Sequence, residues 1–238
     1  QGAKIEGQTD PIVTLKIKEA DRITLLQSAG TVGGDGIPLV VDIDENAFMD
    51  LGRNGQSQVL LTGQNVKEIP DLLGPTLIRV ELFYSNATMI VYGDETIDVT
   101  LLSLVNISRF FLGEDSNTND ISLHGATVKT SKEQFFRVIL TPEQIGKAVK
   151  LSNAYDGSPV VLNVLANASQ DLAGNLNDAQ FGVQVTEYPD IIPPLIVVAT
   201  VDYSDSILFI TGNEVLDGLR SHLVNATRFI ISKISGNT

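Results

Sequence analysis

Short apolar segments, separated by clusters of Gly, Pro, Asn and Asp, make up most of the chain. Many of these segments alternate apolar and polar residues and are rich in β-branched side chains, a pattern typical of half-buried β-strands. Turn-forming residues bound them on both sides, as expected for strands joined by short connections. The predicted strands are residues 11–17, 38–43, 58–66, 75–83, 88–92, 108–113, 121–129, 134–140, 160–165 and 181–187.

Two segments show helical periodicity instead. Residues 17–28 place apolar side chains along one side of a short amphipathic helix. Residues 141–151 begin with a helix-start signature, because Thr141 can cap the first turn, Pro142 suits the first helical position and Gln144 can complete a capping box.

The apolar pattern of residues 70–112 returns at residues 189–231 with a constant spacing of 119 residues and no gap. Thirteen of the 43 positions are identical, and most of the others exchange one apolar residue for another. A return of this length is an internal repeat, and an internal repeat determines the architecture. The chain therefore reads as a window from a longer tandem array.

The repeat predicts three segments. Residues 1–74 form the back part of one repeat, residues 75–193 a complete repeat, and residues 194–238 the front part of the next. Many short strands with a single helix per repeat predict an all-β protein of tandem antiparallel β-sandwich domains, each with one short helix. A parallel α/β sheet would need a helix after nearly every strand.

Several short motifs recur with the strands: Glu95 to Asp98, the run Val-Asn-x-Ser/Thr-x-Phe at 105–110, the turn Asp-Leu-Ala-Gly-Asn at 171–175, and a Pro-Asp linker at 70–75. Together they resemble the tandem immunoglobulin-like (cadherin-like) repeats of very large extracellular surface proteins of bacteria, choanoflagellates and algae. The resemblance implies an Ig-like sandwich in each repeat, and a spacer, adhesin or fibre subunit rather than an enzyme.

The composition narrows the function further. A net charge of −13 argues against a nucleic-acid partner, whose phosphates need Lys and Arg. The chain has no cysteine, which excludes thiolate catalysis, disulfides and Cys-based metal centres. No segment approaches the ~18 uninterrupted apolar residues of a membrane span.

Four Asn-x-Ser/Thr sequons predict N-linked glycans in an extracellular setting. They begin at Asn86, Asn106, Asn167 and Asn225. Asn106 and Asn225 occupy the same position in successive repeats. The alternative is that these asparagines, and the serines or threonines after them, only cap local turns.

A second group of candidates is acidic. Calcium binds six to eight oxygen ligands, and a carboxylate cluster beside a linker can supply them. The predicted calcium ligands are Glu95, Asp98, Asp190, Glu214 and Asp217. Against this, the sequence has neither an EF-hand loop nor a cadherin-type linker, and Asp171 and Asn175 are expected to hydrogen-bond their own turn. No other cofactor is predicted.

Catalysis has little support. The two histidines, His124 and His222, lie in different parts of the repeat, and neither has a histidine at the equivalent position. A general base preserved by the repeat is therefore missing, and we predict a protein that is not an enzyme.

The sequence thus favours a structural glycoprotein: a rod-like array of β-sandwich units in an extracellular fibre or cell-surface filament. The most specific version of this hypothesis is a flagellar hair of algae (mastigoneme). Prolines at the junctions would stiffen the rod. Its partners would be neighbouring repeats of the same chain or further copies of it. The alternative is an adhesin module that binds a glycan or another surface, with linkers rigidified by calcium.

Overall fold

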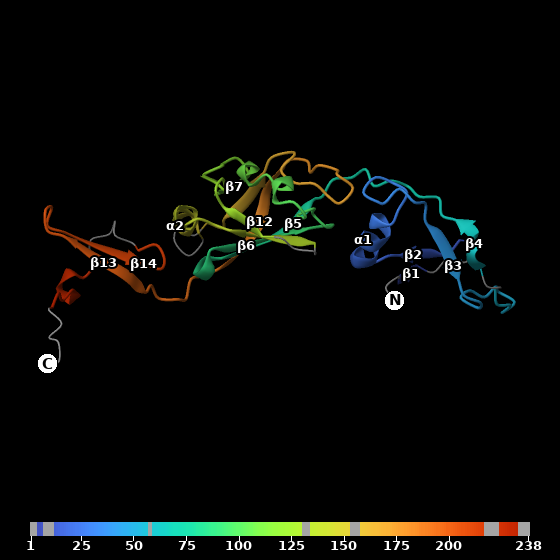
Figure 1. Cartoon of the computed structure of the whole chain (residues 1–238), viewed down its shortest axis with the longest axis horizontal. Coiled ribbons are helices and arrows are strands. Elements are labelled where there is room, and N and C mark those ends of the chain that lie inside the picture. The colour runs from blue at the N-terminus through green and yellow to red at the C-terminus, as the bar shows by residue number, and fades with distance from the viewer. Residues whose placement is uncertain are drawn as a thin grey trace. The chain divides into compact units, whose positions relative to one another are not determined.

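A computed structural model of the chain describes residues 4–6, 12–56, 59–129, 134–152, 158–216 and 224–232. Contacts within the chain divide it into two compact units, Gln1–Pro189 and Asp190–Thr238 (Figure 1). Strand residues (34%) outnumber helical residues (16%), and the sheets are curled. The prediction of a β-dominated fold is confirmed. The repeat boundaries predicted after residues 74 and 193 stay a prediction.

The first 69 residues contain two small sheets and one helix. β1 (Lys4–Glu6) pairs antiparallel with β2 (Thr14–Lys16), and β3 (Val40–Ile43) pairs antiparallel with β4 (Val59–Asn65). Helix α1 (Glu19–Gln27) lies between β2 and β3 in the sequence, and none of its residues is buried. Ala29 is the one buried apolar residue among residues 12–56 and 66–69, the part of this segment whose burial the structure describes.

Residues 77–188 form one curled sheet of eight strands, in the spatial order β8-β7-β11-β12-β5-β6-β10-β9 (Figure 1). Short 3₁₀ turns precede or interrupt the strands at Tyr84–Asn86, Leu102–Leu104 and Ile107–Arg109. The strands are β5 (Leu77–Phe83), β6 (Thr88–Gly93), β7 (Phe110–Gly113), β8 (Ile121–Ser122), β9 (Thr127–Lys129), β10 (Phe135–Ile139), β11 (Val161–Val164) and β12 (Gln180–Tyr188).

One pair of strands corrects the prediction of a purely antiparallel arrangement. β12 and β5 run parallel, with Val185 beside Val80 and Tyr188 beside Phe83. Parallel neighbours cannot be joined by a hairpin and need a long connection. The chain between β5 and β12, which forms the other six strands of the sheet, is this long connection. The parallel pair thus joins the first and the last strand of the sheet in the sequence.

A single core fills the curled sheet. Phe110 of β7 and Phe136 of β10 are fully buried, and their rings meet edge to face with centroids 5.9 Å apart. These strands are second and seventh in the spatial order, so the sheet bends over until its two ends share one core. Val80 and Leu82 of β5 and Met89 and Val91 of β6 alternate with more exposed residues and point inward, and Leu77 is buried before the register shift in β5.

Helix α2 (Pro142–Leu151) confirms the start predicted for it. The Thr141 hydroxyl accepts a hydrogen bond from the Gln144 backbone, and the Gln144 side chain accepts one from the Thr141 backbone. The Gln144 amide also donates to the carbonyls of Ser122 and His124 (2.9 Å each), which attaches the helix to the end of β8. Ala148 packs in the core.

The strand predicted over residues 121–129 is wrong in its middle. The chain forms β8, turns, and then forms β9 as the opposite edge of the sheet. Gly125 has φ +87°, a left-handed conformation that favours glycine and lets the turn form. The segment predicted as one strand therefore contains two, which form the two opposite edges of the sheet.

The remaining strands repeat those of the sheet with fixed offsets. In the second unit, β13 (Ile196–Asp202) and β14 (Ile207–Gly212) form an antiparallel pair whose bounds lie 119 residues after those of β5 and β6. The 3₁₀ turn Ala226–Arg228 likewise follows Ile107–Arg109 by 119 residues. In the first unit, β1 and α1 precede β9 and α2 by 123 residues, and β3 precedes β11 by 121.

We expect Phe110→Ala to destabilise the eight-stranded sheet by about 3–5 kcal/mol, because the substitution leaves a cavity where two ends of the sheet meet. Differential scanning calorimetry of the 238-residue chain would report this as a lower midpoint of the corresponding transition. Phe181→Ala is the matched control, since Phe181 is half exposed on β12. Equal effects of the two substitutions would contradict the packing.

Candidate functional site

Three carboxylates converge where the first 69 residues meet the eight-stranded sheet. One carboxylate oxygen each of Asp71, Glu95 and Asp171 lies within 4.8 Å of the other two. Asp71 lies in the linker after β4, Glu95 in the loop after β6, and Asp171 in the turn before β12. A backbone bridge between Ile97 and Asp171 holds the loop and the turn together.

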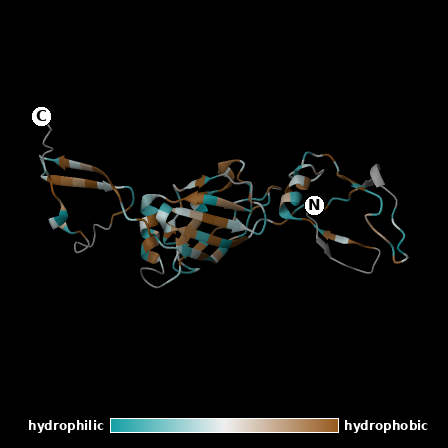
Figure 2. Cartoon of the chain, turned by 90° about the horizontal axis from the view of Figure 1, so that it is seen from below, coloured by the Kyte–Doolittle hydropathy of each residue, from teal (hydrophilic) through white to brown (hydrophobic). Residues whose placement is uncertain are grey.

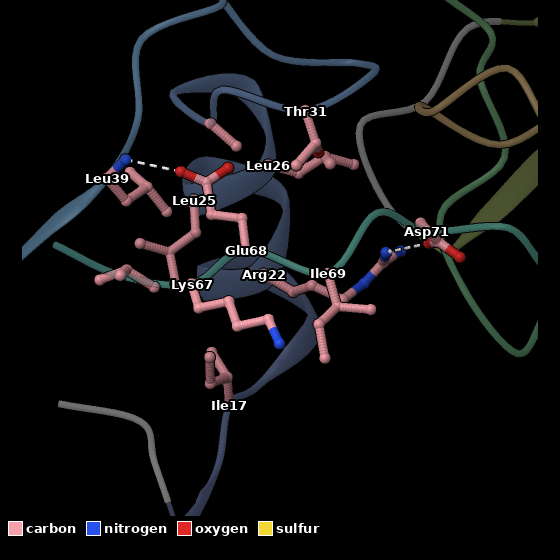
Figure 3. A pocket seen from close by; sticks show the side chains of 12 residues that line it. Ile17, Arg22, Leu25, Leu26, Thr31, Leu39, Lys67, Glu68, Ile69 and Asp71 are labelled. Carbon is pink, nitrogen blue, oxygen red and sulfur yellow. Dashed lines mark hydrogen bonds and ion pairs between the residues drawn. The ribbon is translucent and has the colours of Figure 1, made fainter.

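Arg22 of α1 reaches into this carboxylate cluster. Its guanidinium donates to Asp71 (2.9 Å) and to Glu95 (2.8 Å), and Figure 3 shows the first of these ion pairs. The same guanidinium binds Glu19 with two hydrogen bonds of 2.6 and 2.8 Å. Glu19 in turn accepts a hydrogen bond from the Thr96 backbone at 2.9 Å. The helix is therefore fixed to the loop after β6 through a continuous polar network.

The network changes the acidity of its members. Burial raises the pKa of Glu95 to about 7, and the neighbouring Asp71 adds to the rise while Arg22 opposes it. Burial also acts on Glu19, but hydrogen bonds from Arg22 and from Thr96 outweigh it and lower the pKa of that carboxyl. The hydrogen bond to Glu19 raises the pKa of Arg22, so the guanidinium remains charged.

Asp171 has a structural task within its turn, as the sequence indicated. Its two carboxylate oxygens accept hydrogen bonds from the backbone (2.7 Å) and the side chain (2.8 Å) of Asn175. Asp50 and Asn54 form the same pair of bonds in the first 69 residues, at 2.8 and 2.9 Å. Hydrogen bonds from Asn54 lower the pKa of Asp50. The turn therefore keeps its hydrogen bonds even where its middle residues differ.

The structure separates the predicted calcium ligands. Glu95 joins Asp71 and Asp171, whereas Asp98 accepts hydrogen bonds from the backbone and hydroxyl of Thr100. Asp190 and Glu214 pair in the second unit, where burial and the hydrogen bond with Asp190 raise the pKa of Glu214. Asp217 lies outside the described residues. Calcium binding stays a prediction, and in the first unit a guanidinium already supplies positive charge to the carboxylates.

The sequence did not point to Arg22 or Glu19. Both positions differ between the two helices, because α2 carries Pro142 and Ile145 where α1 carries Glu19 and Arg22. A search for recurring residues therefore passes over them. The signal that was available is an acid and an arginine three residues apart on one helix, facing a linker with an aspartate.

All four predicted sequon asparagines are exposed. At the two equivalent sequons, the asparagine side chain accepts a hydrogen bond from the following hydroxyl: Ser108 to Asn106 and Thr227 to Asn225. Asn86 accepts a hydrogen bond from the Thr88 backbone, and Asn167 has φ +60° in a turn. The turn-capping interpretation and glycosylation are compatible, because the asparagines remain accessible.

Comparison with known proteins supplies no role for any of these residues. No protein family model, curated protein or solved structure matches the chain. Among the described residues, no helix has the length and apolar character needed to cross a membrane. What the carboxylate cluster and Arg22 do in the fold is therefore argued from their own contacts.

We expect Arg22→Met to destabilise the Gln1–Pro189 unit by about 1–3 kcal/mol, because three neighbouring carboxylates lose their partly buried counter-charge. Urea denaturation of the full chain would measure this. Lys147→Met is the control, since it removes the exposed ion pair of Lys147 with Glu143, for which we expect at most about 0.5 kcal/mol. A loss no larger than that of the control would contradict the proposed role of Arg22.

The stability of this unit should also depend on the protonation of Glu95. A folded-state pKa of about 7, against 4.5 for the ordinary carboxyl, means that protonated Glu95 stabilises the fold. This contribution is complete below pH 4.5 and disappears as the pH rises to about 7. After allowance for solvent screening, we expect a loss of about 1–2 kcal/mol over this range.

Glu95→Gln should remove that part of the pH dependence when urea midpoints are compared between pH 4.5 and 8. Glu143→Gln is the control, because the hydrogen bond from Lys147 lowers the pKa of Glu143 and its loss should leave the fall in stability unchanged. If the fall survives in Glu95→Gln, the raised pKa of Glu95 is wrong.

Proposed function

We propose that the chain is a structural repeat region of an extracellular fibre or cell-surface filament, built as a rod-like array of Ig-like β-sandwich units. The recurrence of the same elements with fixed offsets carries this proposal. β5, β6 and a 3₁₀ turn return as β13, β14 and Ala226–Arg228, and β1 and α1 are repeated by β9 and α2. A chain that copies one module head to tail serves as a spacer or filament, because each repeat interacts mainly with its neighbours.

The junction at Asp71 supports a semi-rigid array rather than a flexible string of domains. The linker after β4 contains Pro70 and Pro75, which restrict its backbone. The Arg22 network adds specific hydrogen bonds between a helix on one side of that linker and a loop on the other. A junction stiffened in both ways transmits bending force along the array.

The surface chemistry supports an extracellular setting. All four sequon asparagines are exposed, and the chain contains no cysteine that oxidation could damage. His124 is exposed on the turn after β8, and among the described residues it lies in no cluster of titratable groups. We therefore propose a structural protein without enzymatic activity. The most specific version of this proposal is a mastigoneme-like filament.

Immunogold electron microscopy of cells that produce the protein tests this function. Antibodies raised against the 238-residue chain should decorate filaments outside the cell at a regular spacing, because successive repeats present related epitopes. Antibodies pre-absorbed with the same chain are the control. Gold confined to the cytoplasm, or scattered on material that is not filamentous, would overturn the proposal.

A further inference from the structure

The first and the last strand of the eight-stranded sheet in the sequence lie side by side at its centre. β12 and β5 are the fourth and fifth of the eight strands in the spatial order (Figure 1). β11 flanks β12 on its other side, and β6 flanks β5. Each of these strands is therefore hydrogen-bonded along both sides, whereas an edge strand is paired along one side only. A pull on either strand must break two rows of bonds.

The two strands are connected to the rest of the chain at opposite ends of their pair. The chain enters β5 at Leu77, after the linker at 70–75, and leaves β12 at Tyr188, directly before Pro189. Because the strands run parallel, with Tyr188 beside Phe83 at the end of β5, tension along the chain pulls them in opposite directions along their own axes. The hydrogen bonds of a parallel pair are evenly spaced along the strands, so this sliding loads all of them together. A hairpin pulled at its open end breaks its bonds one after another instead.

Polar side chains hold β5 at the end where the chain enters it. The Gln180 side chain accepts a hydrogen bond from the Leu77 backbone (2.7 Å) and donates one to the Leu77 carbonyl (3.2 Å). These two bonds extend the ladder between β12 and β5 beyond its paired residues. On the other side, the side chain and backbone of Asp94 exchange two hydrogen bonds with the Thr76 backbone, at 2.8 and 2.9 Å.

The second of these attachments recurs one repeat later. In the second unit, the Asn213 side chain accepts a hydrogen bond from the Leu195 backbone (2.7 Å), and the Asn213 backbone donates one to the Leu195 carbonyl (2.9 Å). Leu195 and Asn213 follow Thr76 and Asp94 by 119 residues. The same bonds therefore form with a different side chain, which indicates that the start of this strand is held in successive repeats.

Aromatic and polar side chains hold the end where the chain leaves β12. The rings of Phe83 and Tyr188 stack across the pair, with centroids 4.3 Å apart and planes within 2° of parallel. The hydroxyl of the buried Tyr84 donates a hydrogen bond to the Glu187 carboxylate. Both contacts cross from the end of β5 to the end of β12, so a displacement of one strand along the other breaks them at the start of the movement.

The inner faces of the two strands are apolar. Val80, Leu82 and Val185 are buried in the core of the sheet, and Figure 2 shows hydrophobic residues (brown) along the strands of this central sheet. Sliding of β5 along β12 therefore also withdraws apolar side chains from the core.

We propose that the β5–β12 pair is the force-bearing element of the complete repeat. Tension that enters through the linker before β5 and leaves through the linker after β12 shears this central pair, and the sheet keeps its length until the two strands slide apart. The repeat then unfolds in one step, because the six other strands lie in the chain between them. This inference rests on the proposed function, in which the repeats carry load in a fibre, and adds the interaction that bears it.

Stretching of single molecules tests the proposal in the full chain. The chain contains no cysteine, so Leu72→Cys with Ile191→Cys introduces the only two attachment points for handles. These positions are one repeat apart and exposed (77% and 82%), so the handles pull as neighbouring repeats would. At constant force in magnetic tweezers, we expect a single unfolding step that releases the 119 residues between the handles, a contour length of about 400 Å.

Two partly exposed aromatic residues provide the matched test. Tyr188→Ala removes the stack across β5 and β12. Phe135→Ala removes a ring contact across β10 and β6, where the centroids of Phe135 and Tyr92 are 5.4 Å apart. Under force, Tyr188→Ala should raise the unfolding rate at least about fivefold, the effect of about 1 kcal/mol from an aromatic pair. Phe135→Ala should raise it less than about twofold, although urea denaturation without force should show that both variants lose stability.

Equal acceleration by the two substitutions would overturn the proposal, as would a first step that releases only part of the chain between the handles. Failure of the proposed function has a different signature. If filaments outside the cell carry gold but the two substitutions act equally, the function stands and the force-bearing role of the β5–β12 pair fails. The expected step and rates without labelled filaments give the reverse result.

Discussion

The fold depends on the meeting of strands from opposite ends of the repeat. β5 and β12 pair in parallel, and the rings of Phe83 and Tyr188 stack across the pair with centroids 4.3 Å apart. Together with β7–β11 and β6–β10, this pair joins the front half of the sheet's sequence (β5 to β8) to its back half (β9 to β12). In the spatial order each half contributes only pairs of neighbouring strands, and an isolated two-stranded hairpin is marginally stable in water. The repeat is therefore one cooperative structure rather than two small ones.

Magnitudes indicate which interactions close the sheet and which position its neighbour. Burial of one large aliphatic or aromatic side chain contributes about 1.5–3 kcal/mol, and the strands of these three pairs bury many, among them Leu82, Phe110 and Val138. An ion pair that water can reach contributes about 1 kcal/mol or less. Apolar burial thus closes the eight-stranded sheet. The few bonds of Arg22 can set the orientation of a junction but cannot hold one together.

The sequence predicted the positions of the strands and helices better than it predicted which strands pair and which side chains meet. The 119-residue spacing located β13 and β14, and the Thr141 capping box located α2, because both signals are local or repeated. The parallel pair was not predicted, since its strands are about a hundred residues apart and no local pattern encodes their direction. The segment 121–129 was predicted as one strand, but the turn at Gly125 divides it into two. In the site, Glu95 was found because it recurs, and Arg22 was missed because it does not.

That asymmetry has a physical consequence for the junctions. The acid pair of Asp71 and Glu95 recurs as Asp190 and Glu214, but α2 carries Ile145 at the position of Arg22. Two adjacent carboxylates cannot both ionise cheaply when they are partly buried. In both pairs the pKa of the glutamate is raised: burial and Asp71 raise the pKa of Glu95 to about 7 while Arg22 opposes the rise, and burial and the hydrogen bond with Asp190 raise the pKa of Glu214. Both acid pairs therefore favour a protonated glutamate more than a free carboxyl does, and at the first pair the charge of Arg22 limits this preference.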